Sequence, residues 1–236
     1  MADYLDLKKQ VIDDISRNTR MASQGIKQKI ANRTATYDDA VKYAKAVGNA
    51  AGKALEKYES GIVEDALAEY AETVLAPVYR SVQNATLKAT KSVQKVFNEN
   101  AQFGFAPVDV KPDESRIAHM IARFRTATSF DEVAFLLGSD VAQNVARGAV
   151  TDSMRENGQF MNNAGVDIKF VRDGTNCCDW CASMTGTYAP NELPDDFWRV
   201  HKDCNCSIEY HTTNTHTRIT YSTSDDGKIS KNTTDI

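Results

Sequence analysis

Five cysteines and one histidine are gathered in one short segment of the chain, between Cys177 and Cys206. The chain has no cysteine elsewhere. Thiolates and imidazole nitrogens are preferred donors for Zn²⁺, and a C-x2-C step lets two thiolates on a tight turn reach one ion at about 2.3 Å. Cysteines that serve only to pack a core would not cluster in this way. The segment therefore predicts a zinc site.

The spacing of the donors divides the site into two halves. A C-x2-C step forms the first half and an H-x2-C-x-C run the second; together they contain Cys178, Cys181, His201, Cys204 and Cys206. Joint ligation by Cys204 and Cys206 is strained because a single residue separates them. We favour His201 and Cys204, with Cys206 as an alternate or third donor. Cys177 is one residue out of register and is interpreted as a spare thiol.

We expect this zinc to be structural and the protein not to be an enzyme. A catalytic zinc needs an open coordination position and a nearby acid or base, whereas five candidate donors compete here for one ion. Zinc deaminases carry H-x-E before P-C-x-x-C, and in this chain the histidine follows the C-x-x-C step. A zinc-dependent nuclease or toxin is the enzymatic alternative.

Most of the chain before this segment has helical periodicity. We predict one helix over residues 3–33 and a second from the N-cap Thr36, with Asp38 and Asp39 in its first turn, toward Tyr58. The second helix is rich in Ala and Gly, which suits close approach to a neighbouring helix. One apolar stripe over residues 62–100 predicts a rod of roughly 58 Å, kinked at Pro77.

Further helices are predicted after a Gly/Pro-marked connection at residues 103–112. One begins at Asp113. The next begins at Ser129, because Glu132 stands three residues later as in a capping box, and it runs toward Asn157.

The apolar period changes to two after Gly165, which predicts strands. The alternating positions are Val166, Ile168 and Phe170, then Ile208 and Tyr210, then Ile219 and Tyr221, then Ile229. Asn214 and Asp226-Gly227 would supply the turns. We expect a small antiparallel meander around the metal. The predicted fold is therefore α+β: a helical region (1–164) with a long helix, a zinc-knuckle lobe (165–211) and a Thr-rich hairpin or tail (212–236).

The composition is that of an ordinary globular chain, with 42% hydrophobic and 25% charged residues. A net charge of −4 restricts nucleic-acid contact to a local patch. Arg80, Lys88, Lys91 and Lys95 could form one on the long helix, although a solvated face is the simpler interpretation. The sequence shows neither a signal peptide nor an 18-residue apolar run, so we expect a protein of a reducing cytosol without membrane contact.

The cysteine segment resembles the phage Mu F-like head morphogenesis family, also called minor capsid proteins. That family carries a strand, an Asp-containing turn, C-P-x-C, an L-D-G-like turn, a variable loop and H-P-x-C-R-C. The matching parts here are Val166–Phe170, Asp173, Cys178-Asp-Trp-Cys181, Met184-Thr-Gly186, Leu193-Pro194 and His201-Lys-Asp-Cys204-Asn-Cys206. Asp179, Lys202 and Asn205 stand where the family has Pro, Pro and Arg, and every candidate donor is retained. The resemblance covers roughly residues 150–210.

The resemblance implies a structural minor capsid protein of a tailed bacteriophage, located inside the virion head and in the host cytoplasm during assembly. The implied partners are the portal protein, with the major capsid or scaffolding protein and packaged double-stranded DNA as further candidates. A zinc-stabilised DNA-binding module is the alternative from another class. Salt-dependent binding to duplex DNA would favour that alternative.

Overall fold

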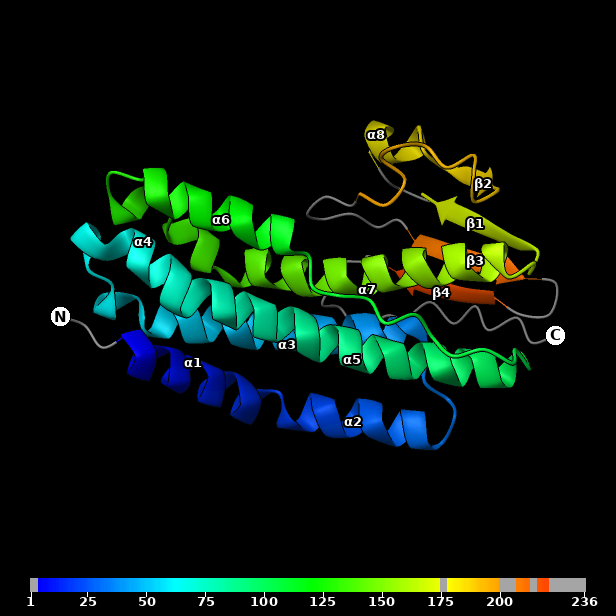
Figure 1. The fold of residues 1–236 in the computed structure, drawn as a ribbon, viewed down its shortest axis with the longest axis horizontal. Coiled ribbons are helices and arrows are strands. Elements are labelled where there is room, and N and C mark those ends of the chain that lie inside the picture. Colours follow the sequence, from blue (N-terminus) through cyan, green and yellow to red (C-terminus); the bar gives the residue numbers. More distant parts are fainter. Residues whose placement is uncertain (1–3, 175–177, 200–206, 213–215, 221–236) are drawn as a thin grey trace.

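The structure is a computed structural model, and it describes residues 4–174, 178–199, 207–212 and 216–220. Helices make up most of this part, and one small antiparallel sheet follows them in the chain (Figure 1). The mostly helical α+β class predicted from the sequence is confirmed at that level. Within the described residues, no helix combines the length and the apolar character needed to cross a membrane.

The first predicted helix is divided into two. α1 (Tyr4–Asn18) and α2 (Arg20–Ala31) meet at Thr19, whose buried hydroxyl donates to the carbonyl of Ile15 at 2.8 Å. A threonine hydroxyl that bonds one turn back can bend a helix, and this local bond was not anticipated. The prediction of one helix over residues 3–33 is therefore wrong at this joint.

The predicted N-cap of the next helix is confirmed. α3 (Tyr37–Lys57) begins after Thr36, whose hydroxyl accepts from the amide of Asp39 at 3.3 Å. The carboxylate of Asp39 in turn accepts from the amide of Thr36 at 3.0 Å. This reciprocal capping box satisfies two main-chain donors that a helix start otherwise leaves without partners.

The long helix begins later than predicted. Short 3₁₀ turns occupy residues 59–61 and 64–66, and the continuous rod comprises α4 (Leu67–Tyr70), a π segment (Ala71–Leu75) and α5 (Ala76–Asn100). The amide of Ala76 donates to the carbonyl of Ala71, five residues back. Because Pro77 has no N–H, the ladder is irregular at the place where a kink was expected.

The helix predicted from Asp113 is present, whereas the one predicted from Ser129 begins ten residues later, at Ser139. Asp113 caps α6 (Glu114–Thr126) by accepting from the amide of Arg116 at 3.0 Å. Ser129 makes no capping bond, and Glu132 accepts instead from the hydroxyl of Thr128 at 2.6 Å. Two 3₁₀ turns, 130–132 and 134–137, follow, and the helix α7 (Ser139–Asn163) starts only after Gly138.

Two glycines bring α3 against α7. A Cβ added at Gly48 would lie 2.4 Å from the Cα of Gln143, and one added at Gly52 would lie 2.3 Å from the Cα of Ser139. The backbones of the two helices therefore touch where these glycines stand. The close approach expected of the second helix is confirmed, and its neighbour is a helix of the same chain.

The sheet contains β1 (Ile168–Asp173), β2 (Gly186–Tyr188), β3 (Ser207–Thr212) and β4 (His216–Thr220), in the order β2-β1-β3-β4. The predicted strands that the structure describes, β1, β3 and β4, pair antiparallel in chain order, as the expected meander requires. β2 was not predicted, and it pairs with the other edge of β1. Tyr221, Ile229 and the predicted turn residues at 214 and 226–227 lie outside the described residues.

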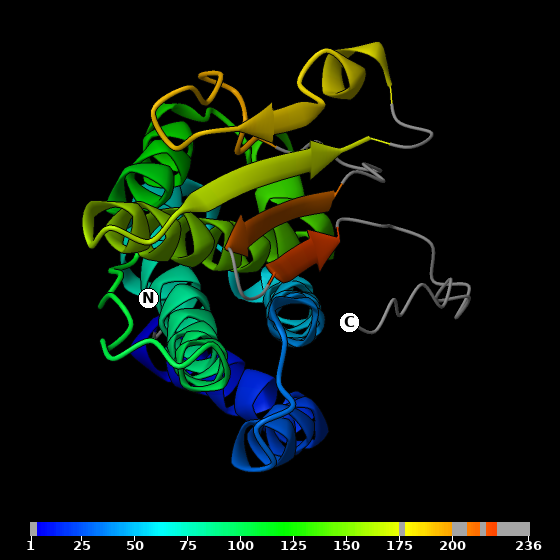
Figure 2. The same ribbon diagram turned by 90° about the vertical axis from the view of Figure 1, so that its right-hand side faces the viewer.

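The sheet lies beside the C-terminal half of α7 and beside α3, opposite to α1 and α2 (Figures 1 and 2). Phe170 of β1 stands over Gly158 of α7, where an added Cβ would be 2.4 Å from its ring. Tyr210 of β3 donates to Gln94 of α5 at 2.7 Å, and Tyr37 of α3 donates to the same oxygen at 2.5 Å. One continuous core thus joins the helices to the sheet.

Candidate metal centre

The register of β1 and β3 places side by side the two strand residues that flank the cysteine segment. Asp173, the last residue of β1, is the partner of Ser207, the first residue of β3. Cys178 follows Asp173 within a few residues, and Cys206 immediately precedes Ser207. The chain therefore leaves the sheet after Asp173, shortly before the first pair of donors. It re-enters the sheet at Ser207, the strand partner of Asp173, directly after the last donor.

The C-x2-C step lies on a tight turn. Cys178 is exposed at the N-cap of the short helix α8 (Asp179–Ala182), and Cys181 is buried within that helix. The amide of Ala182 donates to the carbonyl of Cys178 at 2.9 Å, and the amide of Met184 donates to that of Cys181 at 3.1 Å. The turn leads into β2, which pairs with β1. A turn of this kind is what a pair of thiolates needs to reach one zinc ion.

A buried arginine lies next to this turn. Arg172 of β1 is only 1% exposed. One of its terminal nitrogens, Nη2, donates to the sulfur of Cys181 at 3.5 Å and to the carbonyl of Arg199 at 2.9 Å. The other, Nη1, donates to the carbonyls of Phe197 and, at 3.4 Å, Asp196. The guanidinium therefore joins the cysteine turn to the segment that precedes His201.

The strand pattern of the sequence itself marks Arg172. The alternation Ile168, Phe170, Arg172 places the arginine on the apolar face of the strand, where a charge is unusual. The guanidinium carbon also lies 5.5 Å from the ring of Trp180, a cation–π geometry. A charged residue at an inward-facing position of a strand is therefore the sequence feature that indicates this site.

Aromatic side chains hold the 194–199 segment against the sheet. The ring of Trp198 lies 5.0 Å from that of Phe170 and 4.9 Å from that of Phe197, both edge to face. Tyr188 of β2 packs edge to face on Phe197 at 5.5 Å. Such pairs stabilise beyond their buried area by about 0.5–1.5 kcal/mol each. Trp198 is therefore a packing residue.

Of the predicted donors, Cys178 and Cys181 are within the described residues, whereas His201, Cys204, Cys206 and the spare thiol Cys177 are outside them. In the part that the structure describes, no three His, Cys, Asp or Glu side chains form a group that could hold a metal. The two described thiols are of the donor type that zinc prefers, and their turn fits one half of a site. The complete ligand set stays a prediction.

Three of the four candidate cations on the long helix are paired with acidic residues. Arg80 makes two bonds to Glu114, at 2.8 and 2.7 Å. Lys91 lies 2.8 Å from Asp109, and Lys95 lies 3.8 Å from Glu99 on the same helix. Lys88 is exposed. Paired charges on a solvated face attract phosphates less than an unbalanced patch does.

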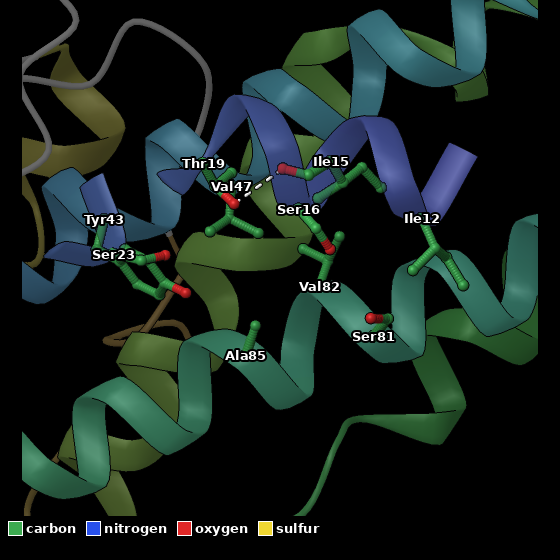
Figure 3. Close-up of a pocket in the computed structure, with 10 residues that line it drawn as sticks. All are labelled: Ile12, Ile15, Ser16, Thr19, Ser23, Tyr43, Val47, Ser81, Val82 and Ala85. Carbon is green, nitrogen blue, oxygen red and sulfur yellow. Dashed lines mark hydrogen bonds between the residues drawn. The ribbon is translucent and has the colours of Figure 1, made fainter. Parts of the chain in front are cut away.

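A cleft of about 230 Å³ lies between α1, the start of α2, α3 and α5 (Figure 3). None of its lining side chains is charged: Ile12, Ile15, Ser16, Thr19, Ser23, Tyr43, Val47, Ser81, Val82 and Ala85. General acid–base chemistry near neutral pH needs a group that titrates there. The lining offers apolar contact and hydroxyl groups instead.

Comparison with known proteins leaves the function to be inferred from the site itself. No family model, curated protein or solved structure matches the chain.

Proposed function

We propose that this chain is a structural minor capsid protein of a tailed bacteriophage, associated with the portal inside the head and stabilised by one structural zinc. The proposal combines the order of motifs in the cysteine segment with the arrangement of the elements around it. The helical part would contact the portal, and the zinc lobe would be a compact appendage.

The observation that carries the zinc part of the proposal is the paired register of Asp173 and Ser207. This register places side by side the two strand residues that flank the cysteine segment, as a site built from both halves requires. The hydrogen bonds from Arg172 to Cys181 and Arg199 add a second link between the same two arms. Both features favour a site that is closed around its ion and structural.

The contact with the portal is assigned to the outer helices because two large apolar side chains are exposed there. Leu5 of α1 is 63% exposed and Met21 of α2 is 84% exposed. We assign these two side chains to the proposed portal contact, where they would be covered by the partner. α1 and α2 also lie on the side of the molecule away from the sheet (Figure 2), so this contact would leave the zinc lobe accessible.

Capture of a portal ring by the full-length protein tests the proposal. Leu5→Asp with Met21→Asp should abolish capture, because charges would replace the apolar contact. Trp180→Ser, which changes an apolar side chain 37% exposed at the zinc lobe, is the control and should capture normally. Loss of capture only in the Trp180 variant would reverse the assigned roles of the two regions.

The DNA-binding alternative is tested with the same protein. Three of its four candidate cations are paired with carboxylates of this chain. Duplex DNA should therefore bind weakly, with little dependence on salt concentration. Failure to capture the portal together with tight, strongly salt-dependent DNA binding would place the DNA-binding function first.

A further inference from the structure

Arg172 occupies the position where the two arms of the proposed zinc site approach each other. It projects from β1, the strand that pairs with both β2 and β3. Its Nη2 atom donates to the sulfur of Cys181 on one arm and to the carbonyl of Arg199 on the other. A single planar group therefore spans both arms.

The second arm leads directly to a predicted donor. Arg199 precedes His201 by two residues, and two residues span at most about 7 Å of chain. The bond to the carbonyl of Arg199 therefore anchors the chain two residues before this predicted donor. The bond to Cys181 fixes a second donor from the same guanidinium.

We infer that Arg172 is the positioning residue of the zinc site: its guanidinium bonds the Cys181 sulfur and the 196–199 carbonyls, and so holds both ligand arms ready for the metal. The inference rests on the proposed zinc site and assigns a role to a residue outside the ligand set. Outer groups that orient metal ligands typically change metal affinity by about 10–100-fold when mutated. A planar guanidinium can bond both arms at once, whereas a lysine ammonium is a compact point charge.

A positioning role differs measurably from a packing role. A residue that only packs the core stabilises the metal-free and zinc-bound proteins equally, so its loss leaves zinc affinity unchanged. A residue that positions the ligands contributes more to the zinc-bound form. The stabilisation that a given zinc concentration provides depends on the dissociation constant for zinc. Loss of a positioning residue therefore also reduces the rise in melting temperature on adding zinc.

The test uses the full chain as wild type, Arg172→Met, Arg172→Lys and Arg199→Met. Zinc affinity is measured by competition with a chromogenic chelator, and unfolding is followed with saturating zinc and with EDTA. Arg199→Met is the matched control, because it removes an exposed side chain paired with Asp196 and keeps the carbonyl that Arg172 bonds. We expect zinc affinity about 10–100-fold weaker in Arg172→Met, clearly weaker in Arg172→Lys, and unchanged in Arg199→Met.

Cobalt substitution adds a readout that packing alone would not alter. The thiolate-to-cobalt charge-transfer band should shift in Arg172→Met, which loses the N–H···S bond, and stay in place in Arg199→Met. If the methionine variant does not fold, the zinc affinity and cobalt spectrum of Arg172→Lys are compared with those of wild type instead. Wild-type protein that binds neither zinc nor cobalt would overturn both the zinc site and this inference. Wild-type binding with unchanged affinity and spectrum in the Arg172 variants would overturn the inference alone.

Discussion

The contact between α3 and α7 and the cysteine lobe around β1 are held together by different physical means. In the helical contact, the backbone of α3 approaches the backbone of α7 at Gly48 and Gly52. In the lobe, a buried charge, Arg172, bonds main-chain carbonyls and a sulfur. Close packing needs no ligand to be stable, whereas the cysteine turn is tied to the 196–199 segment by the polar bonds of one side chain, and a metal would be a further link. We propose that zinc is that link.

The largest expected effect is loss of the metal from the lobe. Cys178→Ser with Cys181→Ser should abolish zinc binding and unfold residues ~165–215, because the binding free energy of structural zinc, about 10–16 kcal/mol in small peptides, is folding free energy. Helix content should be retained. Amide hydrogen exchange measures this: protection should be lost in β1 and β3 and kept in α3 and α7. Loss of the helical signal as well would show that the two regions fold as one unit.

The next effect concerns the helical contact. Gly48→Ala places a methyl group 2.4 Å from the Cα of Gln143, so α3 and α7 must separate. We expect a free energy of unfolding lower by about 3 kcal/mol, the upper end of the usual cost of overpacking. Gly25→Ala in α2 is the control, since nothing lies within 4 Å of its added Cβ; it should stabilise by about 0.5–1 kcal/mol. Equal effects at the two positions in chemical denaturation would contradict the close backbone contact.

A smaller effect is expected where the two regions meet. Gln94 accepts from Tyr37 and Tyr210 and donates to Asn98 at 2.6 Å, all in the core. Burial raises the pKa of Tyr210 well above its ordinary value, so its hydroxyl stays protonated and needs an acceptor. Gln94→Leu should lower the free energy of unfolding by about 2 kcal/mol, because buried donors lose their acceptor.

Tyr210→Phe is the matched variant for this network. It removes one donor and leaves Tyr37 bonded to Gln94, so it should lower the free energy of unfolding by about 1 kcal/mol. In both variants, the unfolding midpoint followed by helix probes and the one followed by sheet probes should shift by the same amount. A shift seen only by sheet probes would mean that the network does not couple the regions.

The smallest effect is electrostatic. Hydrogen bonds from Lys111 and then Lys91 lower the pKa of Asp109 from 3.8 to about 2. Because the pKa is lower in the folded protein, this contribution to stability is present above pH 4 and is lost as the pH falls toward 2. The side chain is exposed, so the contribution is small and salt-dependent. Denaturant titrations of Asp109→Asn should show a shallower loss of stability between pH 4 and 2; an unchanged slope would contradict the pairing.

Features that depend on nearby residues could be predicted from the sequence. The caps at Thr36 and Asp113 are short-range side-chain to main-chain bonds, and their residue types indicate them directly. The same rule failed at Ser129, because Thr128 bonds the carboxylate of Glu132 that the capping box would use. A local signature is therefore informative only when no neighbour competes for its partner.

Features that depend on distant residues could not be predicted in the same way. β2 (Gly186–Tyr188) was missed, because three residues are too few to show a period of two and only their pairing with β1 makes them a strand. The zinc ligands were proposed from their spacing, but Arg172 was missed, because its role depends on Arg199 and Cys181 together. Its position on an apolar strand face was the one available indication.

The zinc content of the full-length protein tests the central claim most directly. The protein should be purified without added metal and analysed by elemental analysis, with folding checked by circular dichroism. We predict about one zinc ion per chain, retained on dialysis and removed only by strong chelators with loss of order in β1 and β3. A fully folded protein that contains no metal, and whose stability is unchanged by zinc or EDTA, would contradict the claim.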